Sequence, residues 1–220
     1  MKKINFNDRY GLTQAVIEGR KTMTRRLINP MPKDCAAVHK NCWGADWSDK
    51  PMTLVVDRDT GGIYCEYCGN GVRLHDGGYH YKAKYKVGEV VAVAQSYENT
   101  GVKPYNYISR PEIDGFQIVS THKGWRNKLF VRAEWMPHRI RITGIKCERL
   151  QDISDACCLK EGIRYVPEID KFYFEDVSRE EGFYFDNHRE AFASLIDKVS
   201  GRGTWASNPW VVVYEFELVK

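Results

Sequence analysis

The sequence contains no apolar run near the roughly 18 residues that a membrane-spanning helix requires. Its first residues, Met-Lys-Lys-Ile-Asn-Phe-Asn-Asp, lack the apolar core of a signal peptide, and no internal repeat or low-complexity tract follows. These absences argue against membrane-spanning, exported, solenoid and fibrous proteins. We therefore expect a cytoplasmic globular protein without a membrane partner.

Cysteine and charge are both limited. Seven cysteines, an odd number in a chain without an export signal, predict free thiols or metal ligands rather than a disulfide framework. The formal net charge of +4 is too small to indicate nucleic-acid binding by itself. Basic side chains nevertheless gather in two segments, which are either solvated faces or positive patches. They are Arg20, Lys21, Arg25 and Arg26 in the first segment and Arg126, Lys128, Arg132, His138, Arg139 and Arg141 in the second.

The hydrophobic pattern predicts several short helices and strands. The most distinctive helix ends at Gly201, because Asn187 and Glu190 form a capping-box pattern and apolar residues then recur with helical spacing. A first helix is expected over residues 8–18, capped by Asn7 and ended by Gly19. The remaining elements are strands over residues 22–28, 88–96, 129–131, 139–150 and 210–219 and a short helix over residues 154–160.

Two segments lie outside this framework. Residues 31–86 are rich in Gly, Asp, Tyr and Cys, and residues 164–186 are rich in Tyr, Phe and acids. We interpret both as insertions in a single domain that covers residues 1–220, a length sufficient for one well-buried core. Strands separated by loops and single helices, without regular βαβ alternation, favour an α+β fold with a mixed or antiparallel barrel-like sheet.

Residues 139–150 alternate between apolar and cationic side chains. Ile140 and Ile142 point to one face of the strand, and Arg139 and Arg141 point to the other. Further along, Trp205 follows a Gly-Arg-Gly turn, and an aromatic side chain beside an arginine can stack on a base. We expect these two arginines and Trp205 to contact a ligand. Solvated arginines and a core tryptophan are the alternative.

Several segments, in this order, resemble the ASCH-domain proteins of bacteriophages and prophages. They are GRKTMTRRLI at residues 19–28, VGEVVAV at 87–93, RLQDIS at 149–154 with EGI at 161–163, and SNPWV at 207–211. The resemblance implies a PUA-like β-barrel with flanking helices, related to domains that bind RNA, and a pocket beside the first helix. The chain departs from the phage pattern at Ala94-Gln95, where an Arg-Glu pair is usual.

A small bacterial relative of this family is an amidohydrolase that removes the acetyl group from the exocyclic amine of cytidine. By motif, its catalytic Lys, Thr and Glu fall on Lys21, Thr24 and Glu161. Amide hydrolysis needs a nucleophile, a base and a proton donor for the leaving amine. The resemblance therefore implies Thr24 as the nucleophile and neutral Lys21 as the base, with Glu161 orienting Lys21 or protonating the amine.

Two physical conditions apply to this set. The pKa of Lys21 must be lowered, and like-charge repulsion from nearby arginines acts in that direction. In an extended strand Lys21 and Thr24 would point to opposite faces, so they converge only if Lys21 lies in the turn after Gly19. The alternative is a phosphate-contacting or solvated patch with Thr24 as an ordinary strand residue. The nearby cations, which we also expect to contact the ligand, are Arg20, Arg25 and Arg26.

Residues 65–69, Cys-Glu-Tyr-Cys-Gly, have the form of a zinc-knuckle turn. A structural zinc would hold together an insertion with little core of its own. Free thiols are the alternative, because the spacing of the second cysteine pair is wide. The expected zinc ligands are Cys35, Cys42, Cys65 and Cys68, with His39, His75 and His80 as alternatives, whereas Cys147, Cys157 and Cys158 are expected to fill the core.

Three functional hypotheses follow. The first is an ASCH-domain binding module that receives RNA or a modified nucleotide or nucleoside in a cationic pocket. The alternative is an amidohydrolase that acts on acetylated cytidine or a similar modified pyrimidine. A third, weaker alternative is a phage assembly factor. Apart from the structural zinc, no cofactor is expected.

Overall fold

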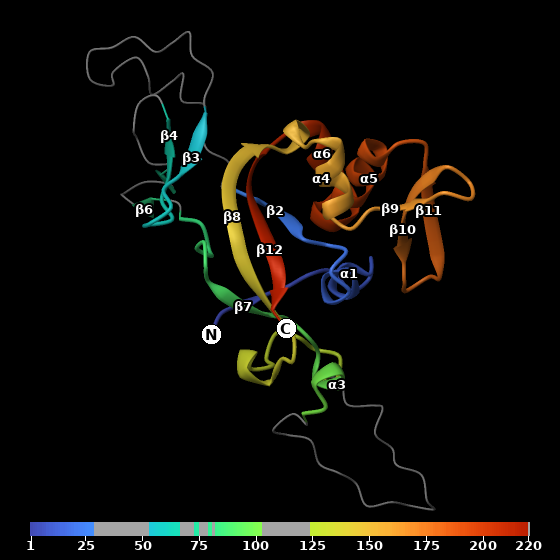
Figure 1. Cartoon of the computed structure of the whole chain (residues 1–220), viewed down its shortest axis with the longest axis horizontal. Helices are drawn as coiled ribbons and strands as arrows, with labels where there is room; N and C mark the ends of the chain where they lie inside the picture. The colour runs from blue at the N-terminus through green and yellow to red at the C-terminus, as the bar shows by residue number, and fades with distance from the viewer. Residues whose placement is uncertain (29–52, 67–72, 75–78, 81, 103–123, 220) are drawn as a thin grey trace, which may run out of the picture.

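The structure is a computed structural model that describes residues 1–28, 53–66, 73–74, 79–80, 82–102 and 124–219. Its centre is a five-stranded sheet in the order β1-β7-β8-β12-β2 (Figure 1). β1 runs parallel to β7, and the other neighbouring strands of this sheet are antiparallel. The strands are β1 (Lys3–Ile4), β2 (Met23–Leu27), β7 (Val90–Val93), β8 (Arg139–Arg149) and β12 (Trp210–Val219).

The long strands β8 and β12 form the middle of the sheet. Ile140 and Ile142 are fully buried on β8, whereas Arg139 and Arg141 are exposed, which confirms the predicted alternation. The register between β8 and β12 shifts after Glu215, opposite Gly144, as a β-bulge does.

The helices gather mainly on one side of the central sheet, where Figure 1 shows α4, α5 and α6 together. The helix predicted after Asn187 is confirmed as α5, and the Asn187 side chain accepts a hydrogen bond from the N–H of Glu190 at 2.8 Å. The helices are α1 (Leu12–Ile17), α3 (Tyr97–Thr100), α4 (Asp155–Lys160), α5 (His188–Ser200) and α6 (Thr204–Ser207), with 3-10 turns at Ala133–Trp135 and Leu150–Asp152.

The insertion predicted over residues 164–186 forms a three-stranded antiparallel sheet. Its strands are β9 (Arg164–Val166), β10 (Lys171–Asp176) and β11 (Glu181–Phe185). The register places Phe172 opposite Phe185 and Phe174 opposite Phe183, so four phenylalanines share the face that packs toward α5.

The described parts of residues 31–86 contain two short hairpins. They are β3 (Leu54–Val56) with β4 (Ile63–Cys65), and β5 (Arg73–Leu74) with β6 (Tyr79–His80). β3 packs against β8. One buried apolar cluster contains side chains of the central sheet, α1, α5 and both inserted segments, so these parts share a core.

Three predicted elements differ from the structure. The strand predicted over residues 88–96 is shorter, because β7 ends at Val93 and the Ser96 side chain caps α3 by accepting the N–H of Asn99. The first helix begins at Leu12 instead of residue 8, because Gly11 adopts a left-handed φ of 63° and Asn7 accepts the N–H of Arg9 in a turn rather than capping a helix. The predicted strand over residues 129–131 is wrong. Leu129 and Phe130 are exposed and lie in turns.

The α+β class is confirmed, with several sheets and short helices. Within the described residues the central sheet has β1 and β2 at its two ends, and no closed barrel is found. The position of β2 at a sheet edge matters for the site, because side chains on both faces of an edge strand can border one cavity.

Candidate functional site

A cavity of about 310 Å³ lies at the β2 edge of the central sheet, beneath α5. Residues on both faces of β2 line it, together with the turn before β2 and the end of α4. Ligand pockets usually enclose about 300–1,000 Å³, so this volume suits one small molecule. The charged and hydroxyl side chains of its floor are Lys21, Thr24, Arg25, Arg26 and Glu161.

Lys21 lies in a turn, as its convergence with Thr24 requires. The N–H of Lys21 donates to the carbonyl of Ala15 at 2.9 Å, and the N–H of Thr22 donates to the carbonyl of Lys160 at 3.0 Å. These backbone bonds tie the turn that connects α1 to β2 to the carbonyls of both α1 and α4. Lys21 and Thr24 therefore line the same cavity despite their spacing of three residues.

Gly162 allows the end of α4 to approach this turn closely. Its φ of +107° is one that other residues rarely adopt. A Cβ at this position would lie 3.1 Å from Cδ2 of Leu12 and 3.7 Å from Cδ of Lys21. The absence of a side chain at Gly162 thus permits Glu161, the preceding residue, to reach the cavity.

The Glu161 carboxylate is the centre of a buried ion-pair network. Nζ of Lys21 donates to Oε2 of Glu161 at 2.6 Å and to its backbone carbonyl at 2.7 Å. Nη1 of Arg25 donates to Oε1 of Glu161 at 2.9 Å. The side chains of Lys21 and Arg25 are only 2% and 1% exposed, so each carboxylate oxygen of Glu161 offsets a buried cation.

Arg25 extends this network across β12. Its Nε and Nη2 donate to Oε1 of Glu148 on β8 at 2.9 and 2.6 Å. The register explains the contact, because Arg25 lies opposite Val213 and Glu148 lies opposite Val211, which places all four side chains on one face. The exposed Lys146 also contacts Glu148, at 2.6 Å.

Burial is the main cause that lowers the pKa of Lys21. The carboxylate of Glu161 acts in the opposite direction, and the charges of Arg26 and Arg25 lower the pKa further. The predicted repulsion is therefore present but secondary. Burial also acts to lower the pKa of Arg25, but Glu161 and Glu148 outweigh it, so that the pKa of Arg25 is raised.

Thr24 supplies a hydroxyl to the cavity. The residue is buried, and within the described part of the chain its hydroxyl has no hydrogen-bond partner. A protonated Lys21 has three N–H donors, of which Glu161 receives two. The Thr24 hydroxyl and one donor of Lys21 thus remain for a ligand.

Arg26 is the other cation of β2 that borders the cavity. Its Nη2 donates to the carbonyl of Asn5, and its guanidinium lies 5.6 Å from the ring centre of Phe6. Burial lowers the pKa of Arg26 from its ordinary value. No carboxylate among the described residues forms an ion pair with this guanidinium, in contrast to Lys21 and Arg25.

Apart from Asn7 and Ser200, the remaining wall of the cavity is apolar. The exposed Val199 and Ser200, near the end of α5, lie at its mouth. Such a wall suits a planar or aliphatic body next to the polar floor. The apolar side chains are Phe6, Leu12, Leu27, Phe192, Leu195, Ile196 and Val199.

Three predicted ligand-contacting arginines do not line this cavity. Arg20 donates to the neighbouring Glu18 at 2.6 Å. Arg139 and Arg141 stand exposed on β8, and Arg141 pairs with Glu217 at 3.4 Å. Their contact with a ligand stays a prediction.

Trp205 is also separate from the cavity lining. Its ring packs edge-on against Phe192, with 6.0 Å between centroids, and the guanidinium of Arg189 lies 5.2 Å from it. The backbone N–H of Trp205 donates to Asp197 at 2.7 Å. Trp205 thus supports Phe192, which does line the cavity.

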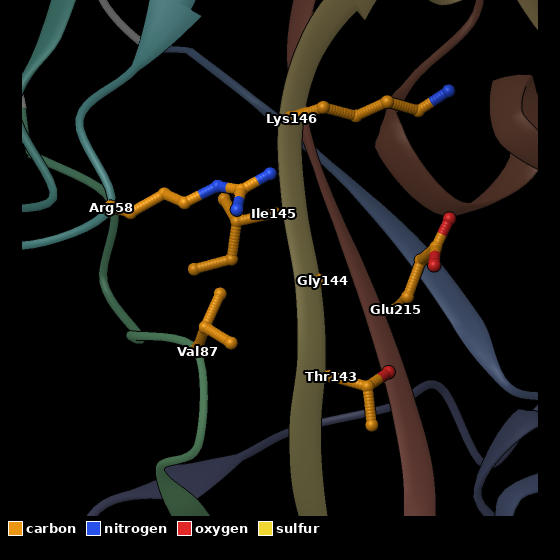
Figure 2. Close-up of a pocket in the computed structure, with 7 residues that line it drawn as sticks. All are labelled: Arg58, Val87, Thr143, Gly144, Ile145, Lys146 and Glu215. Carbon is orange, nitrogen blue, oxygen red and sulfur yellow. The ribbon is translucent and has the colours of Figure 1, made fainter.

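A second hollow, of about 240 Å³, lies beside the bulge of β8. Figure 2 shows Arg58 reaching toward Ile145, while Lys146 extends from the opposite side of β8 and Glu215 extends from the neighbouring strand β12. Gly144 makes room for Glu215, because a Cβ at Gly144 would lie 3.1 Å from Oε2 of that residue. The hollow contains neither the predicted hydroxyl nor the predicted Lys–Glu pair, so we place the functional site at the first cavity.

The predicted zinc site cannot be assembled from the described residues. Cys35, Cys42, Cys68, His39 and His75 lie outside them. Cys65 is buried at the end of β4. Within the described residues no group of three or more His, Cys, Asp and Glu side chains could hold a metal ion.

The thiols outside that insertion behave largely as expected. Cys158 is buried and Cys147 and Cys157 are half-buried. Burial raises the pKa of Cys147 to about 12 and that of Cys158 to about 11, so neither is a thiolate near neutral pH.

Sequence reasoning missed three residues of the site. Glu148 lies 123 positions from Arg25, a separation at which a single sequence gives no pairing signal. Phe6 and Phe192 were not expected to line a pocket, although Phe192 was placed on the apolar stripe of α5. Gln95, where the phage pattern has a charged residue, is buried outside the cavity, and its Oε1 has no partner among the described residues.

Comparisons with protein-family models, curated proteins and solved structures give no match to this chain. Within the described residues, no helix has the length and apolar character needed to cross a bilayer.

Proposed function

We propose that this cavity binds the base of a modified nucleoside or nucleotide. The observation that carries the proposal is a buried polar floor, with a hydroxyl and cations, next to an apolar wall that includes Phe6 and Phe192. A base has two apolar faces and a polar edge, which these two surfaces complement. A base of RNA would have to be unstacked to enter a cavity of this size.

The second candidate is hydrolysis of an acylated exocyclic amine, such as that of acetylated cytidine. The observation that favours it is the Thr24 hydroxyl in the same cavity as the Lys21–Glu161 pair. Lys21 requires the neutral form to accept a proton, and the direction of its pKa favours that form.

The proposed reaction has two steps. Thr24 Oγ1 attacks the acyl carbon while Lys21 Nζ accepts the hydroxyl proton, and that proton passes to the departing amine as the C–N bond breaks. Water then attacks the acyl-Thr24 ester, Lys21 accepts its proton and returns it to Thr24, and the carboxylic acid leaves. Glu161 orients Lys21 throughout, since its Oε2 accepts a hydrogen bond from Lys21 Nζ while its Oε1 accepts one from Arg25.

The resemblance to ASCH-domain proteins supports both functions. A PUA-like barrel built on the central sheet, and a structural zinc in the segment that contains Cys65, remain parts of the proposal. We propose that RNA is contacted outside the cavity by Arg20, Arg139, Arg141 and Trp205. Of these, Arg139 and Arg141 are exposed on β8 and do not line the cavity.

A panel of ligands separates the functions. Purified protein is incubated with cytidine, N4-acetylcytidine, other modified nucleosides and short RNAs, and both binding and product formation are measured. We expect a modified nucleoside to bind saturably and with higher affinity than cytidine. Product formation would establish the hydrolase, whereas binding without conversion would establish the binding module. Binding of RNA alone, with no nucleoside bound, would place function on the outer surface and refute the cavity.

The pH dependence of turnover tests the role of Lys21. Because the folded-state pKa of Lys21 is lowered, its neutral form becomes available below the ordinary lysine value of about 10.4. We expect kcat/KM for N4-acetylcytidine to rise with pH and to level off below that value. Lys21→Met should lose this rising limb together with activity. A profile that is flat from pH 6 to 10 in the wild type would contradict Lys21 as the base.

A further inference from the structure

The charges around the cavity do not balance. Lys21 and Arg25 share the carboxylates of Glu161 and Glu148, two cations against two anions. Arg26 borders the same cavity and has no carboxylate partner among the described residues. The exposed Lys146 also contacts Glu148 but does not line the cavity, and it adds no carboxylate that could pair with Arg26. With Lys21 protonated, the side chains of the floor, together with Glu148, therefore carry about one uncompensated positive charge.

The guanidinium of Arg26 also has unused donors. An arginine has five N–H donors, and within the described residues only Nη2 of Arg26 makes a hydrogen bond, to the carbonyl of Asn5. The contact with Phe6 further fixes the group by placing it near the aromatic ring. A half-buried, oriented and uncompensated guanidinium is suited to a carboxylate or a phosphate, which accepts two parallel N–H bonds.

Arg26 and Thr24 lie on the same face of β2. They stand opposite Val212 and Tyr214, two residues apart, which separates their Cα atoms by about 7 Å. One small ligand can therefore contact both side chains. A ligand whose charged group binds Arg26 would have its amide group or base edge near Thr24 and Lys21.

We propose that the natural ligand of this cavity carries an anionic oxygen group, a carboxylate or a phosphate, that Arg26 binds. The inference rests on the proposed function, because it concerns the same cavity. It narrows the ligand class from nucleosides and nucleotides in general to acidic molecules that have a compact apolar or aromatic body.

Two matched pairs of probes test the proposal by titration calorimetry. The phosphate pair is N4-acetylcytidine 5′-monophosphate and N4-acetylcytidine, and the carboxylate pair is N-acetylphenylalanine and its neutral amide. We expect the charged member of at least one pair to bind at least about tenfold more tightly than its neutral partner. The pair that shows the preference identifies the source of the anionic group.

Variants assign the preference to Arg26. Arg26→Gln should remove the preference for the charged member of the pair, and Arg26→Lys should retain part of that preference. Arg179→Gln, which removes an exposed cation from the turn between β10 and β11, is the control for net charge and should change nothing. Thermal unfolding of Arg26→Gln shows whether the variant is folded. If it is not, Arg26→Lys becomes the test variant, and its preference for the charged probe should be smaller than that of the wild type.

The possible results separate this inference from the proposed function. If charged and neutral nucleosides bind alike, the cavity binds nucleosides but the anion preference is refuted. If only N-acetylphenylalanine binds, and Arg26→Gln abolishes that binding, the anion site stands and the nucleoside proposal fails. If the preference survives in Arg26→Gln, or if none of the four probes binds, the inference is overturned.

Discussion

If the cavity hydrolyses N4-acetylcytidine as proposed, replacing Thr24 by alanine should lower kcat by at least about a thousandfold, because the reaction then lacks its nucleophile. The hydroxyl has no hydrogen-bond partner among the described residues, so its loss leaves no buried donor or acceptor unpaired in the protein. Binding of the same ligand should therefore change by no more than about tenfold, the range of one hydrogen bond. Single-turnover rates and calorimetric affinities measure the two effects separately.

Two further variants sharpen this prediction. Thr24→Ser keeps a hydroxyl in the cavity and should retain turnover, whereas Thr143→Ala removes an exposed hydroxyl from β8, away from the cavity, and should behave as wild type. If Thr24→Ala retained a tenth or more of the wild-type kcat, water rather than Thr24 would be the nucleophile, and only the general-base role of Lys21 would survive.

Replacing Glu161 by alanine should have the largest effect on stability. The change leaves Lys21 without its carboxylate and Arg25 with Glu148 alone, both in a buried environment. Removal of one partner from a buried ion pair costs about 3–5 kcal/mol, because the remaining charge stays without compensation. We expect this loss in the free energy of unfolding measured with urea near neutral pH.

The exposed pair of Arg141 and Glu217 provides the matched control. Both side chains are more than half exposed, so Glu217→Ala should cost no more than about 1 kcal/mol. A double variant, Lys21→Met with Glu161→Gln, should lose less stability than the sum of its single changes, since it removes the buried pair together. Equal losses for Glu161→Ala and Glu217→Ala would show that the network does not stabilise the fold.

The elements that the sequence predicts well are those with a strong local signal. Helix α5 combines a capping residue with a regular apolar stripe, and β8 alternates isoleucine with arginine. The region around Leu129 and Phe130 fails for the opposite reason. Three adjacent apolar residues suggest a strand, but Asn127 accepts the N–H of Leu129 at 2.7 Å and forms a turn that leaves Leu129 and Phe130 exposed.

The site was only partly predictable. The resemblance to ASCH-domain proteins supplied Lys21, Thr24 and Glu161, and the structure brings these three to one cavity. Alternation along β8 correctly indicated an exposed cationic face, but a strand pattern does not reveal which cavity lies nearby. The charge balance that isolates Arg26 depends on Glu148, whose contact with Arg25 arises only from strand order.

The backbone bonds around Lys21 also constrain how a ligand enters and leaves. α1, the turn before β2 and the end of α4 are tied to one another through the carbonyls of Ala15 and Lys160, and Gly162 leaves little clearance between them. This side of the cavity should move as a rigid unit. Ligand exchange is therefore expected to depend on fraying of the last turn of α5 at Val199 and Ser200, so that release kinetics would report on that helix end rather than on the ion pairs.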